Sequence, residues 1–276
     1  HAVMRFLEEK KYIHNENGER LGLNPKTRHI HATYLDTPKE WQGKKLIESA
    51  EETKRADINY YNWLWLGQCI GLDEVIYYMF DESKHVIKYE GQRLAHLGIG
   101  IDYGHMNATT FNAFGVDLPK KRIQGVGSWR HSGRETGKQK SVREYAEAFK
   151  LFVEEIEQKT NQKVLFYAID PSASALRIEI QQLMPRLTPI KANNDVMKGI
   201  GRVQSLKTYN ALVYDPSQTG LIAENKIYAW DTKSIERGVE KPIKDNDHDM
   251  DSERYYVMSV YKHMISILPY LKQGEK

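Results

Sequence analysis

The order of apolar segments along the chain predicts an α/β fold with a mixed sheet flanked by helices. Strand-like segments come first, over residues 94–104, 108–116 and 121–129, separated by turn residues such as Asp117 and Pro119. Helical and extended patterns then alternate, in the order helix, strand, helix, strand, helix. Strands that follow one another closely form an antiparallel meander, whereas strands separated by helices pair in parallel through right-handed crossovers.

The later elements can be placed by their periodicity. Residues 141–159 repeat apolar side chains at helical spacing behind Ser141, a residue that favours helix starts. The segment 164–170 is a buried-strand pattern that ends in an acid. The remaining expected elements are helices at 172–184, 195–209 and 218–224, strands at 187–192 and 212–215, an edge-like strand at 226–230 and a helix after Asp247.

Residues 1–90 are expected to form a mostly helical linker segment, and residues 91–276 the sheet domain. A helical pattern runs from Pro38 to Leu66. His29 and His31 would share one face of a short strand, but with no third ligand nearby they indicate a solvated strand face and not a metal site.

Composition excludes several classes of protein. The chain has 276 residues, 40% of them hydrophobic and 28% charged, as in globular proteins. No apolar run approaches the ~20 residues of a membrane span, so we expect no membrane partner. Cys69 is the single cysteine, which rules out an internal disulfide framework and favours a reducing compartment. The net charge of +3 does not by itself indicate nucleic-acid binding.

The run DNDHDMDSERYY near the C-terminus is the most informative segment. In a helix, Asp247, His248 and Asp251 share one face of the first turn, where the helix dipole favours negative charge. A charged first turn is also ordinary helix chemistry. A calcium loop fails in detail, because Met250 replaces the turn glycine and Tyr256 the last glutamate. The arrangement suits a divalent metal if further ligands come from elsewhere.

Two predicted strands end in such ligands, Asp102 in GIGIDYG and Asp170 in FYAIDPS. If these strands are neighbours, the two acids lie side by side and Asp251, His248 and Asp247 join them. Clustered carboxylates repel one another unless cations neutralise them, and hard oxygen ligands favour Mg²⁺ or Mn²⁺. Two such ions about 4 Å apart would clamp a phosphodiester during hydrolysis.

Each acid alone has an alternative explanation. Asp170 precedes Pro171 and a predicted helix, so it can serve simply as an N-cap. Asp231, in the YAWDTK segment, is a weaker candidate ligand. The prediction of a metal site therefore rests on these acids and His248 taken together, and not on any one of them.

The strands ending in GIDYG and AID, followed by NDHDMDSERY, resemble the nuclease domain of phage terminase large subunits. The late motif of that family, of the form DH-x-x-D-A-hydrophobic-R-Y, is matched here by Asp247, His248, Asp251, Arg254 and Tyr255. Ser252 and Glu253 depart from it without affecting the ligands. The segments HATYLDTP and YYNWLWLGQCIG resemble the end of the family's ATPase region and its linker.

The resemblance implies an RNase H-like fold and a metal-dependent endonuclease that cuts concatemeric double-stranded DNA during packaging, leaving a 3′-hydroxyl and a 5′-phosphate. It implies Asp102, Asp170, Asp251 and His248 as catalytic residues. It further implies a packaging ATPase before this segment, the portal protein and terminase small subunit as partners, and the host cytoplasm as location. His1 to Met4 would then include expression residues.

A basic stretch, SWRHSGRETGKQKSVR, predicts contacts to DNA phosphates without base specificity. A solvated charged loop is the alternative. A P-loop is excluded, because the glycine spacing is one residue short and Gln139 replaces Ser or Thr. The candidate phosphate ligands are Arg130, Arg134, Lys138, Lys140 and, from the neighbouring hairpin, Lys121.

Two other functions are compatible with parts of the sequence. GIDYGHMNATTF resembles the first phosphate loop of actin-like ATPases and sugar kinases, but AIDPSASA lacks the glycine of their second loop. A non-catalytic portal-docking module is the other alternative, in which the aromatic residues Tyr60, Tyr61, Trp63 and Trp65 make the contact; core or hinge packing is the simpler explanation for them.

Overall fold

The protein is described by a computed structural model that covers residues 12–14, 20–23, 26, 32–56, 61, 64–66, 75–104, 108–231, 234, 239–244 and 247–271. The chain divides into two compact units. The first comprises His1–Met79 with Ala229–Ile243, and the second Phe80–Tyr228 with Lys244–Lys276. The boundary thus falls before the residue 90 expected from the sequence, and a later segment returns to the first unit.

The first unit contains short elements. Strands β1 (Tyr12–His14) and β2 (Arg20–Leu23) pair antiparallel, and the turns η1 (Tyr34–Asp36) and η2 (Lys39–Trp41) precede helix α2 (Lys44–Ala56). Helix α2 confirms a helix within the predicted range. The predictions for His29, His31, Tyr60, Trp63 and Cys69 lie outside the described residues.

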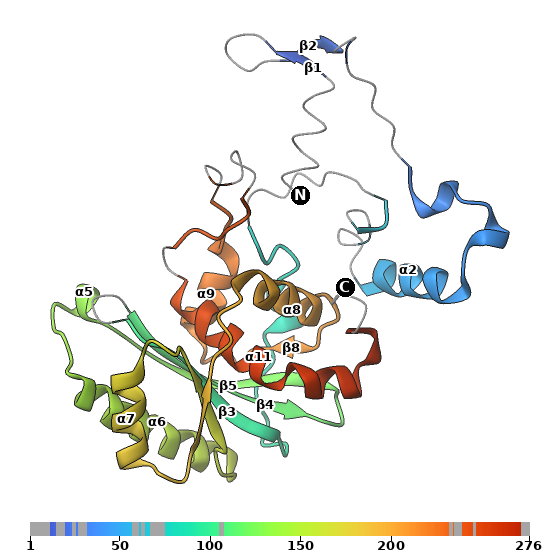
Figure 1. The fold of residues 1–276 in the computed structure, drawn as a ribbon. Coiled ribbons are helices and arrows are strands. Elements are labelled where there is room, and N and C mark those ends of the chain that lie inside the picture. Colours follow the sequence, from blue (N-terminus) through green and yellow to red (C-terminus); the bar gives the residue numbers. More distant parts are fainter. Residues whose placement is uncertain are drawn as a thin grey trace. The chain divides into compact units, whose positions relative to one another are not determined.

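The second unit is built on a mixed sheet with the strand order β7-β6-β3-β4-β5-β8 (Figure 1). The three central strands form the predicted antiparallel meander, and the strands after them join in parallel. The bounds are β3 Ala95–Asp102, β4 Ala108–Asp117, β5 Arg122–Ser132, β6 Phe166–Ile169, β7 Thr188–Lys191 and β8 Leu212–Val213.

Helices lie over both faces of this sheet, α6 and α7 over one and α8, α9 and α11 over the other (Figure 1). Helix α6 begins after Ser141, as predicted, and Ser141 forms a capping box with Glu144. The bounds are α4 Glu82–His85, α5 Gly133–Thr136, α6 Val142–Thr160, α7 Ser174–Leu183, α8 Val196–Thr208, α9 Thr219–Ile227 and α11 His248–Ile267. Among the described residues, no helix is long and apolar enough to cross a bilayer.

Two local expectations were wrong. The edge strand at 226–230 is reduced to isolated β-bridges at Ala229 and Trp230, because α9 continues to Ile227 and the Tyr228 amide still donates to the Glu224 carbonyl. The basic stretch after Trp129 is also not wholly a loop. β5 runs on to Ser132 and α5 follows directly, its first turn capped by the Ser132 side chain.

Alternation along β3 separates the two faces of the sheet. Leu97, Ile99 and Ile101 belong to the apolar core shared with α6 and α7, whereas Gly98 and Gly100 alternate with them. A Cβ on Gly100 would collide with the carbonyl oxygen of Ser252 in α11. The glycine therefore lets the backbone of α11 approach the sheet directly beside the end of β3.

Candidate active site

Polar residues from neighbouring strands form a row under the first turn of α11. Asp102 at the end of β3 is paired in register with Thr110 of β4, and Thr110 with Arg130 of β5. Asp170 directly follows Ile169 of β6, which is paired with Ile101. Paired residues share a face of a sheet, so the row continues the glycine face of β3. The condition stated in the sequence analysis, that the strands ending in Asp102 and Asp170 are neighbours, is therefore met.

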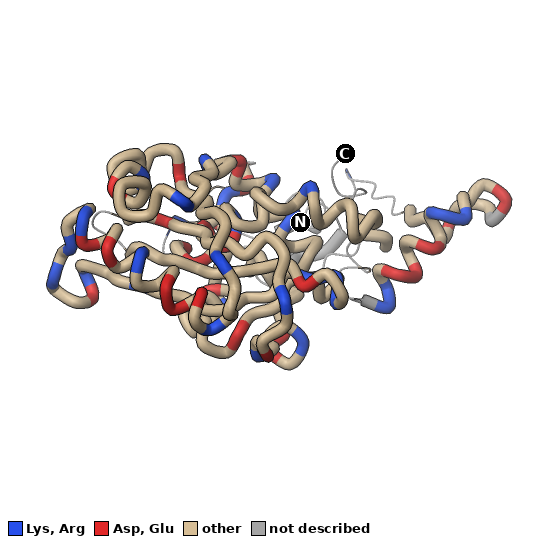
Figure 2. Tube along the Cα trace, turned by 90° about the horizontal axis from the view of Figure 1, so that it is seen from below, with Lys and Arg blue, Asp and Glu red and all other residues tan. Residues whose placement is uncertain are grey.

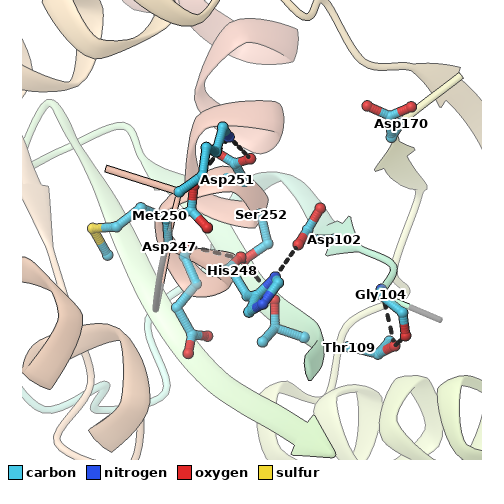
Figure 3. A network of polar contacts seen from close by, with 12 residues as sticks. Asp102, Gly104, Thr109, Asp170, Asp247, His248, Met250, Asp251 and Ser252 are labelled. Carbon is cyan, nitrogen blue, oxygen red and sulfur yellow. Dashed lines mark hydrogen bonds and ion pairs between the residues drawn. The ribbon is translucent and has the colours of Figure 1, made fainter. Parts of the chain in front are cut away.

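His248, the first residue of α11, meets Asp102 in this row. Its Nδ1 lies 2.8 Å from Asp102 Oδ2, and Thr110 Oγ1 donates to the His248 carbonyl at 2.9 Å. Burial raises the pKa of Asp102 to about 6, an effect that the His248 hydrogen bond opposes and the Asp251 charge adds to. The hydrogen bond to Asp102 in turn raises the pKa of His248. Figure 3 shows this pair at the centre of the site.

Asp251 and Asp247 lie beside this pair and share one cation. Arg254 Nη2 donates to Asp251 Oδ1 at 2.6 Å, and Lys244 Nζ lies 3.2 Å from Asp251 Oδ2 and 3.0 Å from Asp247 Oδ2. Asp247 occupies the N-cap position of α11 but makes no side-chain cap bond. Both carboxylates are nearly buried, which makes a neighbouring positive charge necessary.

Asp170 is turned away from the Asp102–His248 pair (Figure 3). Its oxygens accept hydrogen bonds from Asn194 Nδ2 at 2.6 Å, Tyr255 Oη at 3.2 Å and the Ser172 amide at 2.6 Å. Burial opposes ionisation, but these donors outweigh it and lower the pKa of Asp170. The N-cap alternative is wrong, because α7 begins at Ser174 with Ala173 in the cap position.

Within the part of the chain that the structure describes, no group of three or more His, Cys, Asp or Glu side chains is preorganised to hold a metal ion. Each candidate carboxylate instead has a protein partner. The donor set still fits a hard divalent cation, since carboxylate oxygens predominate and the Lys244 ammonium already holds a positive charge between Asp247 and Asp251. A metal would require side-chain rotations and displacement of Lys244.

The predicted phosphate ligands lie in different places. Arg134 and Lys138 are exposed, in α5 and the segment that follows it, and Lys140 is partly exposed just before α6. Arg130 is paired with Glu224, Asp249 and Glu135. Lys121 lies in the β4–β5 turn, at the end of the hairpin opposite Arg130. At ~3.3 Å per strand residue, Lys121 lies about 30 Å from Arg130 and the row of polar residues to which Arg130 belongs.

Among the residues that the structure describes, the charged side chains do not form a single basic stripe. Figure 2 shows basic and acidic residues interspersed along the chain. Asp231 belongs to the first unit, where it accepts a hydrogen bond from Ser234. Tyr61 is only 3% exposed and its hydroxyl bonds with that of Tyr34, which agrees with core packing for this aromatic residue.

Lys244, Asn112 and Glu224 are among the polar residues that the sequence analysis missed. Lys244 stands three residues before Asp247, and Asn112 lies between the apolar residues Phe111 and Ala113, so the sequence gives a weak indication of each. Glu224 left none, because it belongs to a helix that precedes α11 by about twenty residues. Glu224 is 4% exposed and contacts α11 directly.

No protein-family model and no curated protein matches this chain. Among solved structures it is similar to the large terminase of a thermophilic bacteriophage, with 30% identity and a TM-score of 0.69 over 84% of this chain and 55% of that one. The ADP complex of the same terminase gives 31% identity and a TM-score of 0.68, with the same coverage of each chain. This chain thus spans about half the length of those proteins.

The nuclease domain of the phage P22 large terminase is also similar, with 14% identity and a TM-score of 0.51 over 73% of this chain and 97% of that domain. At this identity the likeness concerns the fold alone. The expected RNase H-like sheet is confirmed.

Proposed function

This chain belongs to the phage large-terminase family, corresponding to its C-terminal region, and from that premise we propose that it is a metal-dependent endonuclease that cuts double-stranded DNA during genome packaging. The observation that carries the proposal is the Asp102–His248 contact at the end of β3, with Asp251 and Asp247 beside it. A partly buried acid–imidazole pair next to nearly buried carboxylates is costly to fold and is typical of a catalytic site.

Asp102, Asp251 and Asp247 would hold Mg²⁺ or Mn²⁺, with Asp170 and His248 as further ligands. When bound, a pair of such ions would lower the pKa of a water molecule and neutralise charge on the reacting phosphate. The protein's own part is to orient the ligands. Thr110 fixes the helix start that carries His248, and Arg254 fixes one oxygen of Asp251. Tyr255 and Asn194 restrain Asp170.

DNA binding is proposed for the basic residues of the segment between β5 and α6. Arg134, Lys138 and Lys140 are suited to phosphate contacts, which position the duplex without reading bases. Arg130 shares its guanidinium among three carboxylates, and Lys121 lies at the far end of the hairpin. Low base specificity follows from contacts of this kind. Contacts with the portal protein and small subunit, and action in the host cytoplasm, are proposed on family membership alone.

Plasmid cleavage tests the proposal, with EDTA, Mg²⁺ or Mn²⁺ added to the protein and to Asp102→Asn. We expect cleavage only with a divalent metal, and its loss in the variant. Asp231→Asn serves as the matched control, because Asp231 lies in the other unit, and it should cut DNA at the parent rate. Absence of cleavage with every metal, combined with ATP binding, would instead support the actin-like phosphate-loop alternative.

A further inference from the structure

We propose that Glu224 and Arg130 are positioning residues that hold the first turn of α11 in the rotation that the metal site requires. The inference rests on the proposed nuclease function for its catalytic meaning. The side-chain hydrogen bonds of Glu224 and Arg130 go to Asp249, Met250 and Glu135 and to each other, and not to the candidate ligands His248 and Asp251. They act through the backbone of α11 and through Asp249, which lies between the two ligands in sequence.

Glu224 caps α11 from another helix. Its Oε2 accepts hydrogen bonds from the amides of Asp249, at 2.8 Å, and Met250, at 3.3 Å. The first amides of a helix have no partner within the helix. Asp247, at the N-cap, does not supply one through its side chain. The buried Glu224 carboxylate therefore takes the place of a local cap. Its position at the N-terminus of α11 also suits a negative charge, which the positive end of the helix dipole stabilises.

Arg130 holds Glu224 and Asp249 together. Its Nη1 lies 2.8 Å from Glu224 Oε1 and 3.2 Å from Asp249 Oδ2, both on nearly buried side chains. Two buried carboxylates at this spacing would repel each other and pay a desolvation cost without a cation. Arg130 supplies that cation from β5, in register with Thr110 and hence in the same row as Asp102.

Asp249 sets the rotation of α11 about its axis. Asn112 Nδ2 donates to Asp249 Oδ1 at 2.7 Å and also lies 2.7 Å from Ser252 Oγ. A Cβ on Gly220 of α9 would press against Asp249 Oδ2, so the two helices meet closely here. With Asp249 held on this side, the adjoining His248 faces Asp102. A rotated helix would lose that contact.

A different role for Arg130 makes a contrasting prediction. Its side chain is 27% exposed, enough for a direct phosphate contact of the kind predicted from the sequence. A phosphate ligand affects DNA affinity and leaves metal affinity unchanged. Substituting a positioning residue should instead lower metal affinity and leave DNA affinity unchanged. Residues that hold metal ligands in place typically alter metal affinity or activity by about 10- to 100-fold.

The experiment measures Mn²⁺ binding by calorimetry, duplex affinity in Ca²⁺ and amide hydrogen exchange in the parent chain and its variants. For Glu224→Gln and Arg130→Gln we expect Mn²⁺ affinity to fall at least about tenfold, with duplex affinity within about twofold. Gln cannot replace Glu224, since both carboxylate oxygens accept from donors and one amide nitrogen would face a donor instead. Arg130→Lys should recover part of the loss.

Matched controls separate the two roles. Glu135→Gln removes only the exposed partner of Arg130 and should leave Mn²⁺ affinity unchanged. Arg134→Gln should weaken duplex binding while keeping Mn²⁺ affinity. If Arg130→Gln behaves like Arg134→Gln, the positioning role is overturned.

Hydrogen exchange keeps the inference independent of the nuclease proposal. Failure of the parent chain to bind Mn²⁺ or cut DNA would refute the proposed function. The capping role would still be decided by the amides of Asp249 and Met250, whose exchange should accelerate at least about tenfold in Glu224→Gln. Unchanged protection of these amides in a folded variant would overturn the inference.

Discussion

The two faces of the central sheet use the same strands for different purposes. On the face covered by α6 and α7, residues such as Ile99, Phe111 and Phe149 form a continuous apolar and aromatic core. On the face covered by α11, Phe114 and Phe166 pack against Tyr256, but the positions toward the end of β3 hold Gly100, Asp102 and their small or polar neighbours. The first face provides burial of apolar surface, whereas the second provides close approach and hydrogen-bonded partners.

Several polar groups on this face are as deeply buried as the apolar core, and this makes their partners indispensable. Lys207 of α8 and Glu253 of α11 are fully buried and lie 3.3 Å apart, and Tyr214 donates to Glu253 at 2.6 Å. Replacing such a pair by apolar residues of equal size is often neutral or stabilising, but removing one partner alone leaves an uncompensated buried charge. We therefore expect that packing on the face covered by α6 and α7 can be weakened without altering the site, whereas a change on the face covered by α11 alters it.

The largest expected effect on stability comes from the apolar face. Phe149→Ala removes a fully buried ring that packs against Phe111 and Tyr167. We expect the free energy of unfolding to fall by about 3–5 kcal/mol. Below the melting transition, cleavage per folded molecule should stay at the parent value. Denaturant unfolding together with a cleavage assay on the same sample checks both, and a large loss of rate in the folded variant would contradict the separation of the two faces.

A smaller change on the face covered by α11 should affect cleavage more than it affects stability. Gly100→Ala adds one methyl group that collides with the Ser252 carbonyl. We expect the free energy of unfolding to fall by about 1–3 kcal/mol, because overpacking displaces α11. Cleavage should fall further than stability does, since α11 carries His248 and Asp251.

Gly201→Ala in α8 is the matched control for this substitution. Apart from the neighbouring backbone of α8 itself, no atom lies within 4 Å of the added Cβ, and alanine favours a helix by about 0.5–1 kcal/mol relative to glycine. Unfolding free energy should therefore rise slightly and cleavage should not change. Equal effects of the two substitutions on cleavage would show that the contact between β3 and α11 has no special role.

The smallest expected effect concerns Lys244. Its ammonium lies at both Asp247 and Asp251, although its side chain is 60% exposed. Lys244→Gln removes a cation that competes with a metal for these carboxylates. An exposed ion pair is worth about 0–1 kcal/mol, so we expect Mn²⁺ to bind about two- to fivefold more tightly by calorimetry.

The corresponding change in the other unit, Lys241→Gln, removes a lysine that is 4.0 Å from Asp231. It should leave Mn²⁺ affinity as it is. Weaker Mn²⁺ binding in Lys244→Gln would mean that the lysine supports the metal site and does not compete for it.

Local pattern alone determined the mixed sheet, the meander and most helices. Period-two alternation in β3 and helical period in α6 are consequences of backbone geometry that the residues themselves display. The same alternation identified Asp102 and Asp170 as acids at strand ends, and the spacing of His248 and Asp251 placed them on one helix turn.

Only the tertiary structure decided how charged residues are used. Arg130 and Arg134 are similar in sequence context, yet one is paired with buried acids and the other is exposed. Lys121 lies far from the row because β5 is long, and Glu224 reaches α11 because α9 packs against it. Periodicity assigns a residue to a face of its own element, but the partner of a buried charge comes from a distant segment, and packing alone selects it.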